Sequence, residues 1–375
     1  MFKKWRELDY IILLIVGIFM AVSTIAIYSA TNLTKYEGLH MNNLLLYGVS
    51  GILVCVLALI DYRIFVRKLS YLLYGIGIVF LIYVMFQGVT INGSRRWINL
   101  AFIQFQPSEL VKIALILVIA KLQEKRQGDA LQVWSDILPI TLFTAVPFVL
   151  VLMQPDLGTA IVFISIYIGM LWSGNIRIKH IAVGAGTAAA IVGLIVALYY
   201  FDFNLFSKIV KPHQLERIQT FLDPGADPNS AWHVMNSLTA VGVGQLFGKG
   251  FQHGFYTQNG FIPYNYADSI YVVIGEEFGF AGSALLLILF FLLFYRMIRI
   301  ASECKDLSGS YIVVGVISML TLQIFENIAM HIGMMPMTGI ALPFISYGGS
   351  SLLTNMIAVG LVLSVRTHRN RHDIP

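Results

Sequence analysis

The sequence has 375 residues, of which 57% are apolar, 12% charged and 13% aromatic, and its mean hydropathy is +0.76. Soluble domains carry about 25% charged residues, and a run of about 20 apolar residues is typical of a membrane-spanning helix. This chain has half that charge and many such runs, which excludes the soluble fold classes. Cys55 and Cys304 fit neither a disulfide framework nor metal-ligand spacing. The net charge of +5 lies in short basic blocks between apolar runs, which indicates membrane topology and not nucleic-acid binding.

Ten stretches are predicted to be transmembrane helices, so we expect an all-α membrane protein, a single polytopic unit over 1–375. Seven of the stretches are long apolar runs, almost all of them free of charge. They cover 10–34, 38–60, 69–94, 137–155, 157–176, 180–201 and 269–295.

The other three spans are less regular. The last apolar block, 327–365, is too long for one helix of about 20 residues, and prolines and a glycine interrupt it. It is therefore predicted to contain the end of a helix that begins near Leu307, then a loop, then a last helix. The weakest span, 107–120, is interrupted by Glu109 and Lys112.

The basic residues of the loops predict the orientation. Cytoplasmic loops are enriched in Lys and Arg, and alternate loops counted from a cytoplasmic N-terminus hold 17 of the 25 Lys and Arg residues. Both termini are therefore predicted to be cytoplasmic. The largest polar region, 202–267, then becomes an extracytoplasmic loop between the seventh and eighth helices, with ordered short helices. The segment 95–105 is predicted to be an outer interfacial or re-entrant element.

Ionisable residues inside the predicted spans mark the candidate site, because a charge in hydrocarbon costs about 2.5–3.5 kcal/mol. All of them fall in the outer half of the bundle, and the inner half is predicted to contain essentially no buried charge. Such a distribution favours a site that opens outward, whereas transporters place ionisable groups near the midplane. The residues are Glu109, Lys112, Asp156, Asp268, Glu276, Glu277 and Glu326.

Several of these residues also have a structural interpretation. Glu109 and Lys112 are three positions apart, so a structural ion pair is as good an explanation as a functional one. Asp156 and Asp268 each precede a predicted helix and could simply cap it.

Three other patterns limit the site. Glu276 and Glu277 point about 80° and 180° away from Asp268 at about 100° per residue, so the three carboxylates cannot share one site. Asn327 and His331 are four apart and are expected to make interhelical hydrogen bonds. The glycine-rich run at 242–250 fits neither phosphate-loop pattern, and the histidines show no metal-binding motif.

A long motif near the C-terminus resembles the hallmark of a known family. Residues 327–351, NIAMHIGMMPMTGIALPFISYGGSS, are similar to the SEDS family, the RodA, FtsW and SpoVE proteins of bacterial wall synthesis. The short cytoplasmic tails favour the RodA branch over the FtsW branch. Four further pieces agree in order and spacing: QPSELVK at 106–112, QPDLGT at 154–159, RIQTFLDP at 217–224 and GEEFG at 275–279.

The resemblance implies a peptidoglycan glycosyltransferase that polymerises lipid II at the outer face of the bacterial cytoplasmic membrane. In the family the essential acid commonly lies within Thr-Asp-Phe-Ile-Phe. The matching stretch here, Ala-Asp-Ser-Ile-Tyr at 267–271, keeps the aspartate, Asp268, but not its neighbours. A class B penicillin-binding protein is the implied partner in the membrane.

The implied reaction assigns roles to residues. A base must take the proton from the acceptor sugar's 4-hydroxyl when the β-1,4 bond forms, which is worth about 10²–10⁴-fold, and Asp268 is the hypothesis for it. The departing diphosphate needs positive charge, from Mg²⁺ or Mn²⁺ with unknown ligands or from outward basic residues, although such residues could equally contact lipid head groups. The predicted substrate-binding residues are Asp156, Arg217, Lys249, Arg95 and Arg96, and the predicted supports of the cavity are Glu109, Lys112 and Glu276.

Two other functions are compatible with the family. A lipid II flippase would need a polar path to the inner leaflet, which the one-sided distribution of charges does not provide. A scaffold that holds the penicillin-binding protein is compatible with the polymerase.

Overall fold

Apolar helices make up most of the protein, which the computed structural model describes over residues 7–32, 34–91, 94–100, 103–201, 206, 215, 219–221 and 228–369. Eight helices among these residues are long and apolar enough to cross a membrane. They are α2 (Tyr10–Thr31), α3 (Leu39–Leu59), η1 (Ile64–Leu69) with α4 (Ser70–Gln87), η2 (Val133–Ile137) with α6 (Leu138–Met153), α8 (Ile178–Phe201), α13 (Ile270–Glu303), α14 (Leu307–His331) and α15 (Gly349–His368).

Two shorter helices occupy the remaining predicted stretches. Helix α7 (Leu157–Ser173) has 17 residues and is apolar, and α5 (Pro107–Glu124) has 18 and carries Glu109 and Lys112. The last apolar block divides as predicted, because α14 ends at His331 and α15 begins at Gly349.

A small antiparallel sheet follows α4, so the prediction of an all-α fold is wrong over residues 89–105. Strands β1 (Val89–Ile91), β2 (Ser94–Leu100) and β3 (Ile103–Phe105) pair in the order β1-β2-β3. β-Branched and aromatic residues favour strands here, and an antiparallel meander pairs its own backbone groups. The segment predicted to be interfacial is thus a sheet.

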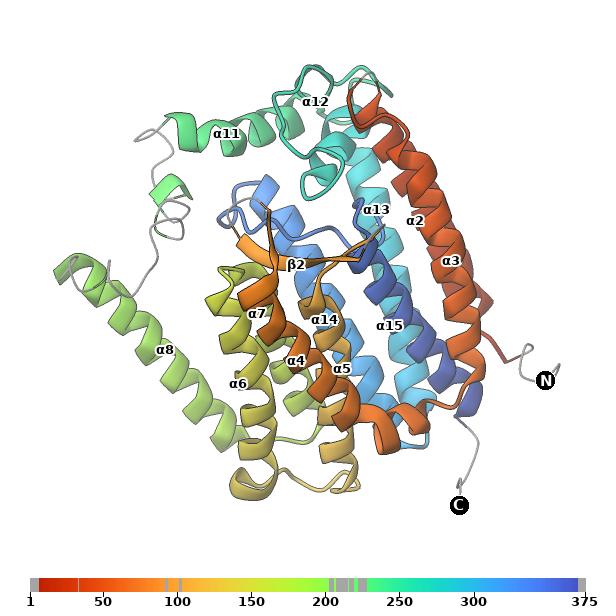
Figure 1. Cartoon of the computed structure of the whole chain (residues 1–375), viewed down its shortest axis with the longest axis vertical. Coiled ribbons are helices and arrows are strands. Elements are labelled where there is room, and N and C mark those ends of the chain that lie inside the picture. The colour runs from red at the N-terminus through yellow and green to blue at the C-terminus, as the bar shows by residue number, and fades with distance from the viewer. Residues whose placement is uncertain are drawn as a thin grey trace.

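One end of the bundle is covered by short helices and is called the capped end. Helices α11 (Pro228–Val243) and α12 (Phe255–Gln258) lie over it in Figure 1, and the sheet lies on the same side. The prediction of ordered short helices within 202–267 is therefore confirmed for the described part of that region, mainly 228–267.

The segment that covers this end, residues 228–267, is called the cap. It joins the bundle at a break in α13. Gly279 has φ 65° and ψ −159°, a conformation open essentially to glycine alone. The broken helix finds replacement partners in the cap, where the N–H of Phe280 donates to the carbonyl of Gln245 at 2.8 Å. The glycine-rich run 242–250 therefore packs against this helix, and a Cβ at Gly248 would lie only 2.1 Å from a carbonyl oxygen of α13.

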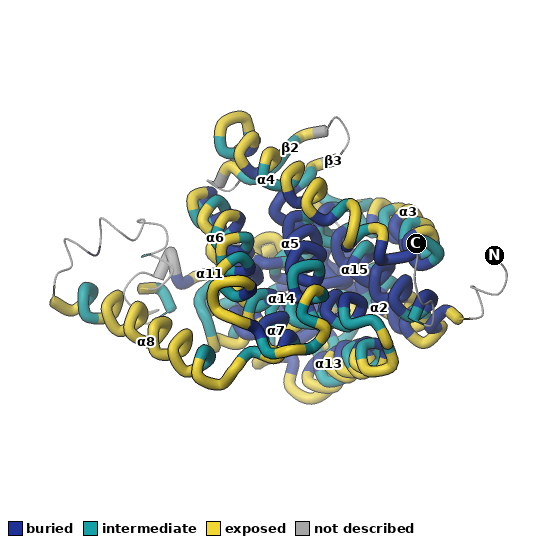
Figure 2. Tube along the Cα trace, turned by 90° about the horizontal axis from the view of Figure 1, so that it is seen from below, coloured by how far each residue is buried: buried dark blue, intermediate teal, exposed yellow. Residues whose placement is uncertain are grey.

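Helix α5 lies in the interior of the bundle. Of its 18 residues 14 are buried, whereas no residue of α8 is buried; Figure 2 shows α5 among the dark blue helices and α8 apart. Glu109 and Lys112 are 6% and 0% exposed, and Lys112 Nζ donates to Glu109 Oε1 at 2.9 Å. The predicted ion pair is present. It is buried within the protein, so neither charge is exposed to lipid.

The opposite end also contains buried charges, which corrects the prediction that this half has none. All are less than 10% exposed and lie at helix starts and connections, not in the middle of helices. Each has a partner of opposite sign. They are Asp9, Asp61, Arg63 and Asp136.

Asp306 organises one of these clusters. Its carboxylate accepts hydrogen bonds from Arg63 Nε at 2.7 Å, from Tyr62 at 3.0 Å and from the Ser308 backbone N–H at 3.0 Å. Burial by itself raises the pKa of this carboxyl, but the bonds from Arg63 and Ser308 outweigh burial and hold its pKa below the usual 3.8. Asp306 thereby ties the connection between α3 and α4 to the start of α14.

Removal of one member of the buried pair in α5 is expected to destabilise the protein. Lys112→Met leaves the Glu109 carboxylate buried without its partner, which typically costs about 3–5 kcal/mol of unfolding free energy. The double variant Glu109→Gln/Lys112→Met should regain most of that loss, because no lone charge remains. Thermal unfolding of the detergent-purified protein measures both, and an equal loss in the single and double variants would contradict the interpretation.

Asp306 is expected to make stability depend on acid. Because its folded pKa is lowered, its stabilisation is present above its usual pKa and is lost as pH falls through the folded pKa. Asp306→Asn should therefore lower the unfolding free energy by about 1.5–3 kcal/mol at pH 7, and the difference from wild type should shrink below pH about 4. Unfolding temperatures recorded from pH 7 to pH 3 test this, and a difference that stays constant with pH argues against it.

Candidate functional site

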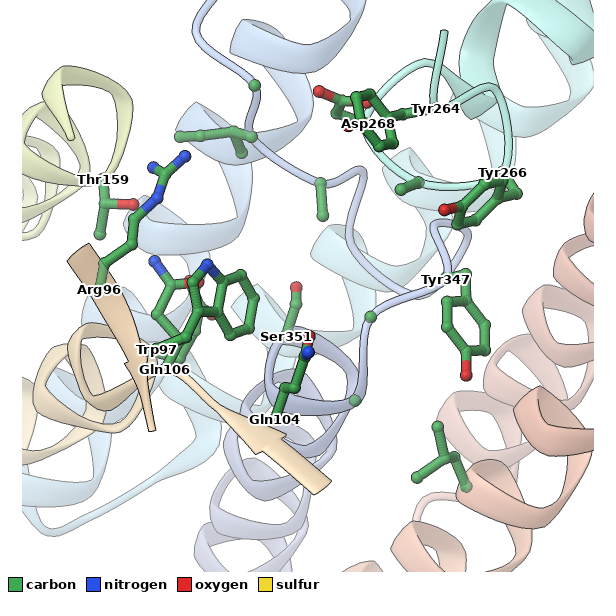
Figure 3. A pocket seen from close by; sticks show the side chains of 18 of the residues that line it. Arg96, Trp97, Gln104, Gln106, Thr159, Tyr264, Tyr266, Asp268, Tyr347 and Ser351 are labelled. Atoms are coloured by element: carbon green, nitrogen blue, oxygen red, sulfur yellow. The ribbon is translucent and has the colours of Figure 1, made fainter. Parts of the chain in front are cut away.

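A cleft of about 970 Å³ lies at the capped end. It is bounded by α3, the sheet, the first turns of α5 and α7, and the segments before α13 and α15 (Figure 3). Its walls bring together polar and aromatic side chains from segments far apart in sequence. Those used below are Arg96, Gln106, Glu109, Asp156, Tyr266, Asp268, Gly339 and Tyr347.

Asp156 both caps a helix and lines the cleft, so the two interpretations of its sequence position hold together. Its Oδ1 accepts from the backbone N–H of Thr159 and caps α7 at 3.2 Å. Its Oδ2 pairs with Arg96 at 2.7 Å and accepts from Gln106 Nε2 at 3.1 Å. A buried carboxylate thereby joins the sheet to the starts of α5 and α7.

Arg96 comes from β2 and retains capacity for a further anion. Its side chain is 18% exposed, although its Nε is buried and has no hydrogen-bond partner within the described part of the chain. Because a guanidinium has five N–H donors, the pair with Asp156 leaves others that can bind oxygen atoms in the cleft.

Glu326 extends the charged cluster into the interior. It is 1% exposed, lies close enough to Asp156 and Lys112 to interact electrostatically, and has no hydrogen-bond partner for either oxygen in the described regions. It does not line the cleft. The acids and bases of α5, α7 and α14 therefore form one buried cluster behind Arg96.

Asp268 lines the cleft directly before α13, and the cap of that helix is Ser269, without a side-chain capping bond. The backbone carbonyl of Asp268 accepts from Asn327 Nδ2 at 2.6 Å and is 3.0 Å from His331 Nε2. The pair was expected to make interhelical hydrogen bonds, but these bonds instead join α14 to the turn before α13. The Asp268 carboxylate faces Gly339, where an added Cβ would lie 3.5 Å from Oδ2.

Glu276 and Glu277 lie outside the cleft, which agrees with the prediction that they do not share a site with Asp268. Glu276 accepts from the backbone N–H groups of Tyr256 and Thr257 at 2.8 and 2.9 Å. Glu277 accepts from Ser29 Oγ at 2.6 Å. Gln258 Nε2 of α12 also donates to Glu277 Oε1 at 2.9 Å, so both carboxylates bind the segment that covers the capped end.

Two of the other predicted substrate-binding residues do not line this cleft. Arg95 and Lys249 are exposed and do not line it, and Arg217 lies outside the described residues. Of the predicted cationic residues, Arg96 is the one that the structure places in the described walls.

Sequence reasoning missed the aromatic and amide groups of the cleft. Tyr266 packs against Tyr36 and Tyr347, with ring centroids 4.7 and 6.1 Å away, and Tyr266 and Tyr347 lie across the cleft from Arg96 in Figure 3. Gln106 and Tyr347 fall within the recognised motifs, which was an available signal. Nothing in the sequence marks Tyr266 as facing the same space.

The described residues do not build a dedicated metal site. No group of three or more His, Cys, Asp or Glu side chains among them is placed to hold a metal. Mg²⁺, however, is commonly held by one or two carboxylates together with substrate phosphates. The carboxylates of the described cleft therefore fit a cation that enters together with a diphosphate better than one that the protein holds by itself.

Comparison with known proteins identifies the family. The family model FTSW_RODA_SPOVE, described as "Cell cycle protein", matches residues 7–371. The chain belongs to the FtsW/RodA/SpoVE family. The resemblance drawn from its motifs is therefore confirmed, and with eight candidate spans this family member is a multi-pass protein of the bacterial cytoplasmic membrane.

Relatives and solved structures match over nearly the full length. Stage V sporulation protein E of Bacillus subtilis (strain 168) is 35% identical over 95% of this chain and 94% of its own. Peptidoglycan glycosyltransferase MrdB of Escherichia coli (strain K12) is 32% identical over 97% and 94%. A chain solved under "Structural coordination of polymerization and crosslinking by a peptidoglycan synthase complex" has a TM-score of 0.82 at 30% identity, over 97% of this chain and 99% of that one. The Thermus thermophilus rod shape determining protein RodA has a TM-score of 0.71 at 27% identity, over 97% and 98%.

In this FtsW/RodA/SpoVE protein a histidine of the cap contacts the residue after Asp268. His233 Nε2 lies 3.1 Å from Ser269 Oγ. Burial lowers the pKa of His233 from 6.5 to about 4. The imidazole therefore stays neutral in the folded protein over the physiological range.

His233 is expected to make the folded state sensitive to mild acid. Between pH 6.5 and about 4 the unfolded chain binds a proton at this residue and the folded chain does not, so the unfolding free energy falls as pH falls through that window. His233→Gln should flatten this part of the profile, as measured by unfolding temperature against pH. If the unfolding temperature of the variant depends on pH as steeply as that of wild type, another group is responsible for the effect.

Proposed function

We propose that this chain is a peptidoglycan glycosyltransferase that polymerises lipid II into β-1,4-linked glycan strands, with Asp268 as the general base. The observation that carries the proposal is the cleft at the capped end, which contains both the Asp268 carboxylate and the Arg96 guanidinium. The names of relatives such as MrdB support it.

The cleft provides what bond formation requires. The Asp268 carboxylate takes the proton of the acceptor sugar's 4-hydroxyl, and the oxygen attacks the anomeric carbon of the donor sugar. The bond from that carbon to the lipid diphosphate breaks, and the diphosphate leaves with the electron pair. A positioned base contributes about 10²–10⁴-fold to such a step.

Arg96 is suited to the departing diphosphate. Asp156 and the β2 strand fix its position, and the partly exposed guanidinium retains N–H groups that can bind phosphate oxygens. Charge that is fixed in advance where negative charge develops lowers the barrier without reorganisation. Asp156 then acts on the substrate through Arg96, while Arg217, Lys249 and Arg95 remain proposed contacts outside the described cleft.

The proposed topology has ten spans, with α5 and α7 added to the eight long helices, and both termini in the cytoplasm. In support, ion pairs that involve Arg67, Arg126 and Arg366 lie at the end away from the cleft, where the positive-inside rule requires basic residues. The capped end, with the 202–267 loop, then faces outward.

A class B penicillin-binding protein is the proposed membrane partner, since the solved structure named for a peptidoglycan synthase complex aligns with 97% of this chain. A divalent cation, Mg²⁺ or Mn²⁺, is proposed to enter as part of the lipid II diphosphate complex, where it would neutralise phosphate charge.

Purified full-length protein, with its penicillin-binding partner, should convert lipid II into glycan strands that are resolved on gels. Asp268→Ala should abolish strands, because no base remains in reach of the acceptor hydroxyl. Glu37→Ala is the matched control: this acid is exposed at the capped end and does not line the cleft, so strand yield should be unchanged. Chelation by EDTA should slow the reaction, and added Mg²⁺ should restore it.

Two outcomes would redirect the proposal. Undiminished strand synthesis by Asp268→Ala would remove Asp268 from the mechanism. If wild type with its partner forms no strands but moves lipid II across vesicle membranes, the chain is a flippase.

A further inference from the structure

We infer that Asn327 and His331 are positioning residues that hold Asp268 at its working place in the cleft. The inference rests on the proposed role of Asp268 as base and adds to it the groups that aim the carboxylate. Neither residue lines the cleft, so each acts through the backbone of Asp268 and not on substrate.

The carbonyl of Asp268 is held by side chains and not by its own helix. In a regular helix the N–H of Val272 would donate to this oxygen, but it donates to the Ser269 carbonyl at 3.0 Å instead. Asn327 Nδ2 and His331 Nε2 reach the Asp268 oxygen at 2.6 and 3.0 Å. Both donors come from one face of α14, because residues four apart on a helix are neighbours.

The chemistry of the contact defines the donors. A carbonyl oxygen only accepts, so His331 carries its proton on Nε2. Asn327 and His331 are 0% and 1% exposed, which keeps water from competing for the same oxygen. Loss of either donor would therefore leave the carbonyl with a single partner that water cannot replace, and the turn at Asp268 would be expected to move.

Asn327 additionally joins the two sides of the cleft. Its Nδ2 also donates to the carbonyl of Ile340 at 2.7 Å, and the neighbouring Gly339, with φ 74°, faces the Asp268 carboxylate. One amide thus sets the gap between the aspartate and the 338–341 wall. His331, in contrast, contacts the carbonyl of Asp268 and not that of Ile340.

This difference predicts distinct kinetics for the two residues. A displacement of about 1 Å at a reacting group can cost about 10²-fold in rate. Loss of the His331 donor should lower kcat about 10–100-fold and leave the KM for lipid II nearly unchanged. Loss of Asn327 should lower kcat and also raise KM, because the opposite wall is released.

The test measures kcat and KM for lipid II with the full chain and its partner. His331→Gln places an amide nitrogen near the position of Nε2, whereas His331→Asn is too short, so the two variants differ mainly in reach. His331→Gln should keep kcat within about threefold, and His331→Asn should show the predicted loss. Asn327→Leu is matched by Gln123→Leu, which removes another buried amide that donates to a carbonyl, that of Met170 at 2.7 Å, at the opposite end of the bundle. Gln123→Leu should lose thermal stability but keep kcat.

The outcomes separate the two proposals. If Asp268→Ala is inactive while His331→Asn and Asn327→Leu keep wild-type kcat, the positioning role is wrong and the base survives. Equal kcat losses in His331→Gln and His331→Asn, or in Asn327→Leu and Gln123→Leu, would also overturn it, since reach and location would not matter. If Asp268→Ala still makes strands, Asp268 is not the base, and the positioning role that rests on it is rejected as well.

Discussion

The fold depends on keeping charges paired inside an apolar bundle. Lys112 cannot be left alone in hydrocarbon, so its bond to Glu109 requires α5 to be surrounded by other helices. The same requirement links Asp156 to Arg96, which draws the sheet onto the first turns of α5 and α7. The polar cluster behind the cleft therefore also determines that the sheet packs on the starts of α5 and α7.

The cleft is made by hydrogen bonds between distant segments and not by one continuous motif. Asn327 ties the turn before α13 to the 338–341 loop, and Glu276 and Glu277 of α13 bind α12 and its neighbouring residues. Acids that look alike in sequence thus have different tasks. Asp268 lines the cleft, while Glu276 satisfies backbone donors that would otherwise be buried without partners.

Much of this arrangement follows from local rules. Apolar length places the long helices, prolines and a glycine divide the last block, and the rotation of a helix separates Glu276 and Glu277 from Asp268. The sheet was not predicted, because a short run of basic and aromatic residues also suits an interfacial element. The buried charges at the opposite end were missed because their burial depends on how the connections pack on one another, as where Arg63 meets Asp306.

The sequence by itself determined the membrane class and the family, and it singled out Asp268 as a candidate, because hydropathy, long motifs and intramembrane charges can be read along one chain. Only the tertiary structure decided which cation faces the cleft. Arg95 and Arg96 are adjacent in sequence, yet successive side chains of a strand point to opposite faces, and only Arg96 meets Asp156. Partner choice across helices is a property of packing, and that is why Asn327 and His331 acquire a meaning only once α14 lies beside the turn at Asp268.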